Sequence, residues 1–257
     1  MNVVQKQNLN VSSFESDNWI SIRLGKTALE PYHLHAEHPG IGAQQRVLTG
    51  VDLAFADQVT LPSVPIASTL TSTSVLDANI CVVNYYSDSN GTKVTDTLTL
   101  NGPNPVSLSS NLYRIIEMFI ADDSVALNGD VYLGSGAIDI GGVPDVVYDV
   151  MSSELNRSST SVVFVPSQCR LHLKSLVALA LGSASTDKFE VTIDYYPGTN
   201  NSFFRTTHLG VHELTTVFTE SAEVWEFGTY MISIERIAGA GQHRAIIVLD
   251  SILEYLN

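Results

Sequence analysis

Residues 31–40, PYHLHAEHPG, contain three of the seven histidines of the chain together with a glutamate. In an extended backbone alternate side chains share a face, so His33, His35 and Glu37 would lie on one face and His38 on the other. Imidazole nitrogens and a carboxylate are ligands for zinc, iron or nickel. The segment is therefore a candidate for the metal centre of an enzyme, or for a polar contact segment.

A metal centre needs further ligands, normally from elsewhere in the chain. H-x-H followed by a carboxylate resembles the first half of a cupin metal motif, but in that family the glutamate lies further on and a later strand supplies another histidine. The later histidines lack cupin-like surroundings; they are His172, His208, His212 and His243. Prolines at both ends of the segment favour a loop. We expect a contact loop, formed by His33, His35, His38 and Pro39. The alternative is a metal site that uses His33, His35 and Glu37.

The remaining polar residues do not form a recognisable catalytic motif. His208 and His212 have a spacing that suits a helix, in a strand-like stretch. Asp122, Asp123 and Asp130 could pair as the carboxylates of a glycoside hydrolase, but they lie in turn sequences, where Asp bends the backbone. The sequence has no nucleophile elbow, phosphate-binding loop or dinucleotide-binding loop. We therefore expect a protein that is not an enzyme and needs no cofactor.

The charge balance argues against two classes of partner. The 257 residues include 13 basic and 27 acidic side chains, giving a net charge of −14. A protein that binds nucleic acid or an anionic membrane needs clustered Lys and Arg, so neither partner is expected. Charged residues make up only 16% of the chain, and Ser, Thr, Asn and Gly must cover much of the surface. Such a surface suits a protein that lies against neighbouring chains.

Cys81 and Cys169 are the only cysteines, and both lie in apolar runs. We predict two buried, reduced thiols rather than a disulfide. The N-terminus lacks a signal-peptide pattern, and no apolar run approaches the ~18–20 residues of a membrane helix. We expect synthesis in the cytoplasm, where the chain stays soluble or is assembled.

Alternation of apolar and polar residues at every second position is the dominant pattern. It occurs at 92–100 (TKVTDTLTL), 188–196 (KFEVTIDYY) and 231–237 (MISIERI), and is typical of half-buried antiparallel strands. Asn-Gly and Pro-Gly pairs between these runs supply the turns of tight hairpins. We predict an all-β chain of β-sandwich or jelly-roll-like domains.

Two stretches, 79–100 and 189–209, have similar hairpin patterns, and the polar stretch 151–160 lies between them. We predict three parts: an extended N-terminal arm at 1–65, a first β domain at 66–155 and a second β-sandwich domain at 156–257. The arm is expected to order on assembly, as segments that fold on binding do. Deletion of residues 1–40 should then leave the β domains folded and prevent assembly.

Residues 93–133 contain a strand that ends in L-x-L-N-G-x-x-P-V, then a Y-R-I strand and an LNGDVYL strand. Together with SVVFVPSQCRLHLKSL at 161–176 and FEVTIDYYPG at 189–198, this texture resembles a family of virion proteins of tailed bacteriophages over roughly residues 70–215. The N-terminal arm departs from that family. The resemblance implies a non-enzymatic structural protein of the virion, either a capsid decoration (cement) protein or a head or tail appendage. Its partners would be other copies of itself, as a homo-oligomer, and capsid or tail proteins. If the chain is viral, the cytoplasm in which it is made is that of the host.

Two other functions stay open. The first is a carbohydrate- or receptor-binding module at a tail tip, with the pairs Tyr85–Tyr86 and Tyr195–Tyr196 lining a sugar groove. A glycan array would test it. The second is a small metal-dependent enzyme that uses His33, His35 and Glu37, which elemental analysis would test.

Overall fold

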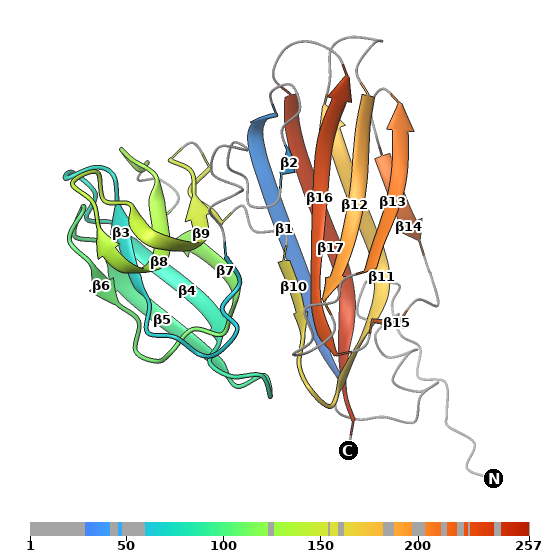
Figure 1. The fold of residues 1–257 in the computed structure, drawn as a ribbon, viewed down its shortest axis with the longest axis horizontal. Coiled ribbons are helices and arrows are strands. Elements are labelled where there is room, and N and C mark those ends of the chain that lie inside the picture. Colours follow the sequence, from blue (N-terminus) through green and yellow to red (C-terminus); the bar gives the residue numbers. More distant parts are fainter. Residues whose placement is uncertain are drawn as a thin grey trace.

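The computed structural model describes residues 29–41, 46–47, 60–122, 126–153, 155–158, 162–181, 188–196, 204–211, 215–219, 224–225, 227–238 and 243–256. This part of the chain contains seventeen β-strands and no helix, which confirms the predicted all-β class. The strands form two bodies that lie side by side (Figure 1). We call residues 60–158 the first lobe, and the body formed by β1, β2 and β10 to β17 the second lobe.

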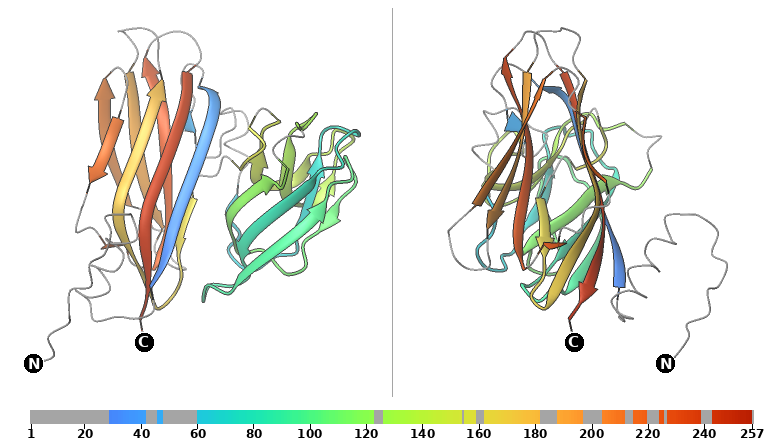
Figure 2. Two further views of the ribbon diagram at one scale, coloured as in Figure 1. Left: turned by 180° about the vertical axis from the view of Figure 1, so that it is seen from behind. Right: turned by 90° about the vertical axis from the view of Figure 1, so that its right-hand side faces the viewer.

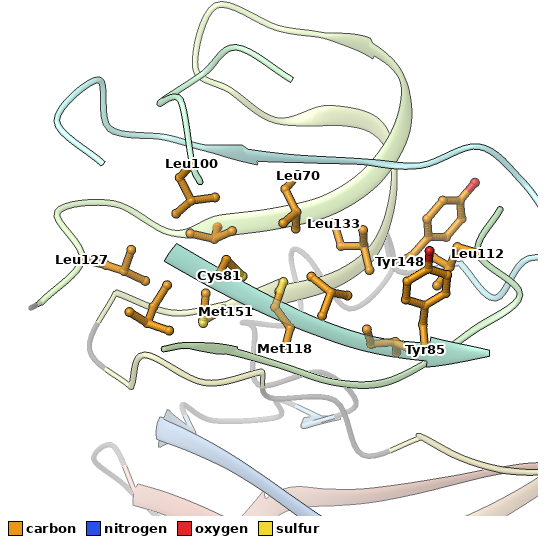
Figure 3. Packing of buried hydrophobic residues seen from close by; sticks show 14 residues of the cluster. Leu70, Cys81, Tyr85, Leu100, Leu112, Met118, Leu127, Leu133, Tyr148 and Met151 are labelled. Carbon is orange, nitrogen blue, oxygen red and sulfur yellow. The ribbon is translucent and has the colours of Figure 1, made fainter. Parts of the chain in front are cut away.

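The first lobe is a sandwich of two antiparallel sheets. One sheet has the order β6-β3-β8-β9 and the other β5-β4-β7. The strands of the first sheet are β3 (Thr69–Ser72), β6 (Val106–Ser107), β8 (Val131–Ile138) and β9 (Pro144–Met151). Those of the second are β4 (Ile80–Tyr86), β5 (Lys93–Thr99) and β7 (Arg114–Ile120). Side chains from both sheets meet in one core, which includes Leu70, Cys81, Met118 and Leu133 (Figure 3).

One buried carboxylate interrupts the apolar alternation of β5. Asp96 follows Val94 and precedes Leu98 on the inward face, and it is 7% exposed. Its Oδ2 accepts hydrogen bonds from the Tyr85 hydroxyl (3.0 Å) and the Ser109 backbone N–H (2.7 Å). The carboxylate is tolerated on this face because these donors replace the water that burial removes.

The second lobe is a larger sandwich, seen edge-on in the right-hand view of Figure 2. One sheet has the order β1-β17-β11-β14, with β15 also paired to β11; the other has the order β10-β16-β12-β13, with β2 also paired to β16. The strands of the first sheet are β1 (Leu29–Ile41), β11 (Cys169–Leu181), β14 (Thr215–Thr219), β15 (Val224–Trp225) and β17 (His243–Tyr255). Those of the second are β2 (Arg46–Val47), β10 (Val162–Val165), β12 (Lys188–Tyr196), β13 (Phe204–Val211) and β16 (Gly228–Ala238).

The alternation read from 231–237 holds in β16. Ile232 and Ile234 are both fully buried, in a core that also contains Leu171 and Leu249 of the facing sheet. Ile193 of β12 packs against the same core. The period-two pattern therefore predicted the inward face of these strands correctly, because successive side chains of a strand point to opposite faces.

β1 shows that the second lobe is built from two separate parts of the chain. Leu29–Ile41 pairs antiparallel with β17, from Leu29 opposite Glu254 to Ile41 opposite His243. The first lobe is therefore inserted between β2 and β10 of the second (Figure 1).

This pairing corrects the interpretation of the PYHLHAEHPG segment as a loop in an arm outside the β core. Two prolines fit into β1 because it is an edge strand, where a residue without an N–H need not break a ladder between two neighbours. The register also shifts between His38 and Ile41, at the Pro39-Gly40 pair. The pairing also changes what we expect from deletion of residues 1–40: the deletion removes nearly all of β1, so we now expect it to destabilise the second lobe.

Candidate interaction surfaces

The structure gives the histidine segment an extended backbone, as the alternation argument requires. The positions opposite His33 and His35 on β17 are Asp250 and Val248. Tyr32, on the other face of β1, is 4% exposed in the core. The positions on the face away from Tyr32 are those of the three candidate ligands, His33, His35 and Glu37.

No group of three His, Cys, Asp or Glu side chains with metal-binding geometry occurs where the structure describes side chains. The side chains of the β1 candidates lie outside that description. The metal site at His33, His35 and Glu37, and the contact role of His33, His35, His38 and Pro39, therefore stay predictions.

The later histidines fall on different strands. His172 of β11 makes a 2.7 Å contact from its Nε2 to Glu254 Oε2 of β17, and the Glu254 side chain is 4% exposed. His208 lies in β13 opposite Val191, and His212 lies outside the described residues. The structure thus places His172 in a pair that joins two neighbouring strands of one sheet.

Of the aspartates in turn sequences, Asp130 has the structural role that the sequence favours. The Asp130 carboxylate accepts a hydrogen bond from the Ser153 backbone N–H at 3.0 Å. Asp122 is exposed at the end of β7, and Asp123 lies outside the described residues. Asp130 thus fixes the approach of two loops, a structural role.

Tyr85 and Tyr86 cannot line a sugar groove, because both side chains are fully buried. The Tyr85 hydroxyl bonds to Asp96, and the Tyr86 ring packs against the second lobe. The side chains of Tyr195 and Tyr196 lie outside the described residues. The carbohydrate-binding interpretation therefore loses one of its two tyrosine pairs.

Four large aliphatic side chains are exposed at one end of the first lobe. Their exposed fractions are 79% for Val75, 73% for Leu76, 49% for Ile80 and 104% for Ile140. We call these four residues the apolar tip. Strand direction places it away from the second lobe: Ile80 begins β4, whereas Tyr86 at the other end of β4 contacts the second lobe (Figure 1). Surface clusters of this kind mark contact sites more often than isolated exposed residues do.

The loops of the apolar tip lie against one another. A Cβ on Gly102 would come within 2.9 Å of Val75 Cα, and a Cβ on Gly142 within 3.4 Å of Pro103 Cα. Loop 101–104 therefore lies between the loop that holds Val75 and the loop that holds Ile140. The four exposed side chains come from neighbouring segments at this end of the lobe.

Asp77 holds the tip loops together. Its carboxylate accepts hydrogen bonds from the Ser72 hydroxyl (2.6 Å), the Asn128 backbone N–H (2.8 Å) and the Gly129 backbone N–H (3.1 Å). Burial raises the pKa of the Asp77 carboxyl, but these hydrogen bonds outweigh it, and the pKa lies below the ordinary value of 3.8. Asp77 is 1% exposed, so it ties the β3–β4 loop to the β7–β8 loop from the inside.

A cavity of about 430 Å³ lies beside the apolar tip. Its lining is mainly apolar and comes from both loops that Asp77 joins. The lining includes Leu76, Ala78, Ile80, Ile120 and Ala121. The volume falls within the range of ligand pockets and would accept a large side chain of a partner.

The contact between the lobes is aromatic and buried. Phe164 of β10 is 1% exposed, and its ring meets Tyr86 and Tyr113 of the first lobe edge-on, each at a centroid distance of 5.3 Å. Phe227 of the second lobe packs on the same ring at 6.3 Å. We call this contact the joint.

Arg114 is buried in the joint. Its guanidinium stacks over the Tyr113 ring at 4.3 Å, donates from Nε to the Thr229 hydroxyl of the second lobe (3.2 Å), and donates from Nη1 to the carbonyls of Pro62 and Tyr113. Burial lowers the pKa of the guanidinium. A buried cation with neutral partners is stable only where all of them stay in place. The arginine therefore opposes separation of the lobes.

Polar contacts surround the joint. Lys93 of the first lobe forms an ion pair with Glu30 of β1, whose other oxygen accepts a hydrogen bond from the Tyr255 hydroxyl at 2.6 Å. At Gly91, φ is +89° and a Cβ would come within 2.6 Å of the Pro166 ring. Only glycine fits there, both for its backbone conformation and for the approach of the second lobe.

In the described part of the chain no helix is long and apolar enough to cross a membrane. The fold defines a class: two all-β lobes, one inserted into the other and fixed to it by a buried joint.

Comparison with known proteins adds little beyond this class. No family model matches the chain, and no curated protein matches its sequence. Among solved structures it is similar to the VP2 subviral particle of infectious bursal disease virus, with 11% identity over 90% of this chain and 71% of that chain, and a TM-score of 0.21. The T13 particle of the same virus gives 11% identity over 89% and 73%, with a TM-score of 0.16. The 7S globulin of Momordica charantia gives 7% identity over 98% and 76%, with a TM-score of 0.12. Two of these three are proteins of virus particles, and scores of this size carry no argument about function.

Sequence reasoning missed the apolar tip and the joint. A signal for the tip exists in TSTSVLDAN, where an adjacent valine and leucine interrupt a polar turn between two strands. The joint has no such signal, because its aromatic residues lie on strands that also build the cores.

Proposed function

We propose that this chain is a non-enzymatic structural protein of a tailed-phage virion that binds neighbouring copies of itself and a capsid or tail protein. The observation that carries the proposal is the buried joint. It fixes one complete sandwich to another through Phe164, Tyr113 and Arg114, and so makes a stiff two-lobed body. In an assembly such a body gives one lobe a place among its neighbours and holds the other in a fixed direction.

Two features of the sequence support this proposal. The low charged fraction of 16% and the Ser- and Thr-rich surface suit contacts with other chains. The resemblance of residues 93–133 and 161–176 to virion proteins of tailed phages points to the same role. The second lobe would contact neighbouring copies, and the first lobe would carry the apolar tip outward, as a decoration protein or an appendage does.

Quantitative mass spectrometry of purified particles from a phage that encodes this chain tests the proposal. We expect the chain in every particle at a stoichiometry fixed by symmetry. Hundreds of copies would indicate capsid decoration, and about six or twelve would indicate a tail or portal component. Absence of the chain from particles that are infectious and complete would refute the proposal.

A gel-filtration and light-scattering experiment on the purified chain tests self-association separately. We expect a discrete homo-oligomer whose mass is a whole multiple of the chain mass of 27.9 kDa. A strict monomer at all concentrations would remove the homo-oligomer from the proposal but leave binding to a capsid or tail protein to be tested by the particle experiment.

A further inference from the structure

We propose that the apolar tip is a docking site for a protein segment that carries apolar side chains next to Lys or Arg. The proposal names the partner chemistry of the first lobe and rests on the proposed function only in placing that partner in a virion. Binding itself is a property of the isolated chain.

The four tip residues are exposed beside a cavity, which indicates a partner with apolar side chains. Val75, Leu76 and Ile140 are each more than 70% exposed, and the 430 Å³ cavity opens next to Leu76 and Ile80. A patch of exposed apolar side chains marks a contact site, and a mainly apolar hollow beside it can receive a partner side chain. The tip supplies both within one group of loops.

The charge of the first lobe indicates that the partner is basic. Residues 60–158 contain three basic residues, Lys93, Arg114 and Arg157, and eleven acidic ones. Lys93 is paired with Glu30 at the far end of the lobe, and Arg114 is buried in the joint. Arg157 is thus the one described base on the lobe surface that is not held at the contact with the second lobe.

Near the tip the exposed acidic side chains outnumber the described exposed base. Asp122 lines the cavity, and Asp139, next to Ile140, is also exposed. The base is Arg157, which pairs with Phe119 beside the cavity residue Ile120. The excess of acidic side chains at this rim would attract a partner with Lys or Arg beside its apolar residues and repel an acidic partner.

The same charges argue against a second copy as the occupant. Two tips face to face would bring acidic rims together in a chain whose net charge is −14. Like charges placed opposite one another across an interface disfavour that pairing. The occupant is therefore a different, basic segment.

Hydrogen bonds join the described parts of the tip loops, at residues 72–77 and 128–130. Asp77 of the β3–β4 loop accepts hydrogen bonds from Ser72 at the end of β3 and from Asn128 and Gly129 of the β7–β8 loop, and the Thr73 backbone N–H donates to the Asp130 carbonyl at 3.0 Å. A surface with fixed loops loses little conformational entropy on binding, which favours a specific contact.

Fluorescence anisotropy with three labelled peptides on the purified full chain tests the proposal. The first, KLSKLVSK, has both features; KSSKSSSK keeps only the charge, and ELSELVSE keeps only the apolar residues. We expect the first peptide to bind at least about tenfold more tightly than either of the others, because both features are needed. Raising the salt from 50 to 500 mM should weaken its binding, because the acidic rim is screened (~3-fold or more).

Matched variants of the chain locate the site. Val75→Ser combined with Leu76→Ser should weaken the first peptide at least about tenfold, because it removes two anchors. Val64→Ser is the control: this valine is 63% exposed but lies outside the tip, and its variant should bind like the wild type. Thermal unfolding of each variant checks that the fold is kept.

Three results would overturn the proposal. The first is equal binding of KLSKLVSK and KSSKSSSK, since the apolar residues would then be irrelevant. The second is unchanged binding to the Val75/Leu76 double variant. The third is an oligomer of the wild-type chain that the double variant dissolves, because the occupant would then be a second copy. None of these results depends on whether the chain is found in particles, so failure here leaves the proposed function standing.

Discussion

Replacing Phe164 with alanine tests whether the joint couples the two lobes. Phe164 is 1% exposed, and its ring contacts two rings of the first lobe and one of the second. Truncation of a buried phenylalanine costs about 3–5 kcal/mol, through lost burial and the cavity that remains. Here the cavity opens between the lobes, so the loss falls on their contact more than on either core. We expect the lobes of Phe164→Ala to unfold in separate steps.

The sequence provides a probe for this separation. The first lobe has no tryptophan, whereas Trp225 lies in β15 of the second lobe. Tryptophan fluorescence therefore reports on the chain outside the first lobe, and far-UV circular dichroism reports on both lobes. In guanidinium titrations the two signals should coincide for the wild type and differ for Phe164→Ala, because probes agree only in a two-state transition.

Leu133→Ala is the matched control. Leu133 is fully buried in the core of the first lobe, and its truncation costs about 2–5 kcal/mol without touching the joint. This variant should lose stability while the two signals still coincide. The reasoning would be refuted if Phe164→Ala lost less than about 1 kcal/mol, or if its two signals stayed coincident.

Further predictions follow from three features. Asp77→Ala leaves four donors without their acceptor, two of them buried, and should destabilise the first lobe by about 2–5 kcal/mol. Because the folded pKa of Asp77 lies below its ordinary value of 3.8, its contribution is fully present above that pH and is lost as the pH falls through the folded pKa; Asp77→Asn should flatten the acid limb of a stability–pH curve. Cys81 and Cys169 are buried and free, and burial raises the pKa of the Cys81 thiol to about 12; Ellman's reagent should label neither in the folded chain and both after unfolding. Deletion of residues 1–40 removes most of β1 with Tyr32 and should cost more than about 3 kcal/mol, measured by thermal unfolding.

A control variant or a contradicting result checks each of these predictions. Deletion of residues 1–28 leaves every described strand in place and should keep the second lobe folded, so equal stability of the two truncations would contradict the role of β1. Fast labelling of Cys81 at neutral pH would contradict its burial. A stability–pH curve that is the same for wild type and Asp77→Asn would show that the Asp77 carboxylate does not cause the loss of stability at low pH.

The all-β class, the hairpins and the inward faces of several strands could be predicted from residue order. Alternation at 231–237 places Ile232 and Ile234 inward, and both are fully buried. The turn sequence SDSNGT also joins β4 and β5 in an antiparallel hairpin, as the Asn-Gly pair predicts. The buried state of Cys81 and Cys169 followed from their apolar neighbours. These features depend on neighbours within a few residues, and so the sequence shows them directly.

The partner of β1 could not be predicted in this way. PYHLHAEHPG has the alternation of a strand, with Tyr32 inward, but two prolines and four titratable residues favour a loop. The prolines are accepted because β1 is at the edge of its sheet and pairs with β17, more than two hundred residues later. Edge position is a property of the whole sheet.

The sequence by itself determined that this protein is an acidic all-β chain with a lightly charged surface, because composition and period-two alternation act locally. Tertiary structure decided which apolar residues lie in a core, which lie in the joint and which stay exposed. It placed Leu29–Ile41 in the second lobe and inserted the first lobe after β2 in the chain. It buried Tyr86, Phe164 and Arg114 in the joint. Val75 and Leu76 stayed exposed at the end of the first lobe away from the joint. Whether an apolar residue is core, joint or contact surface depends on what packs against it, and that is set by segments distant along the chain.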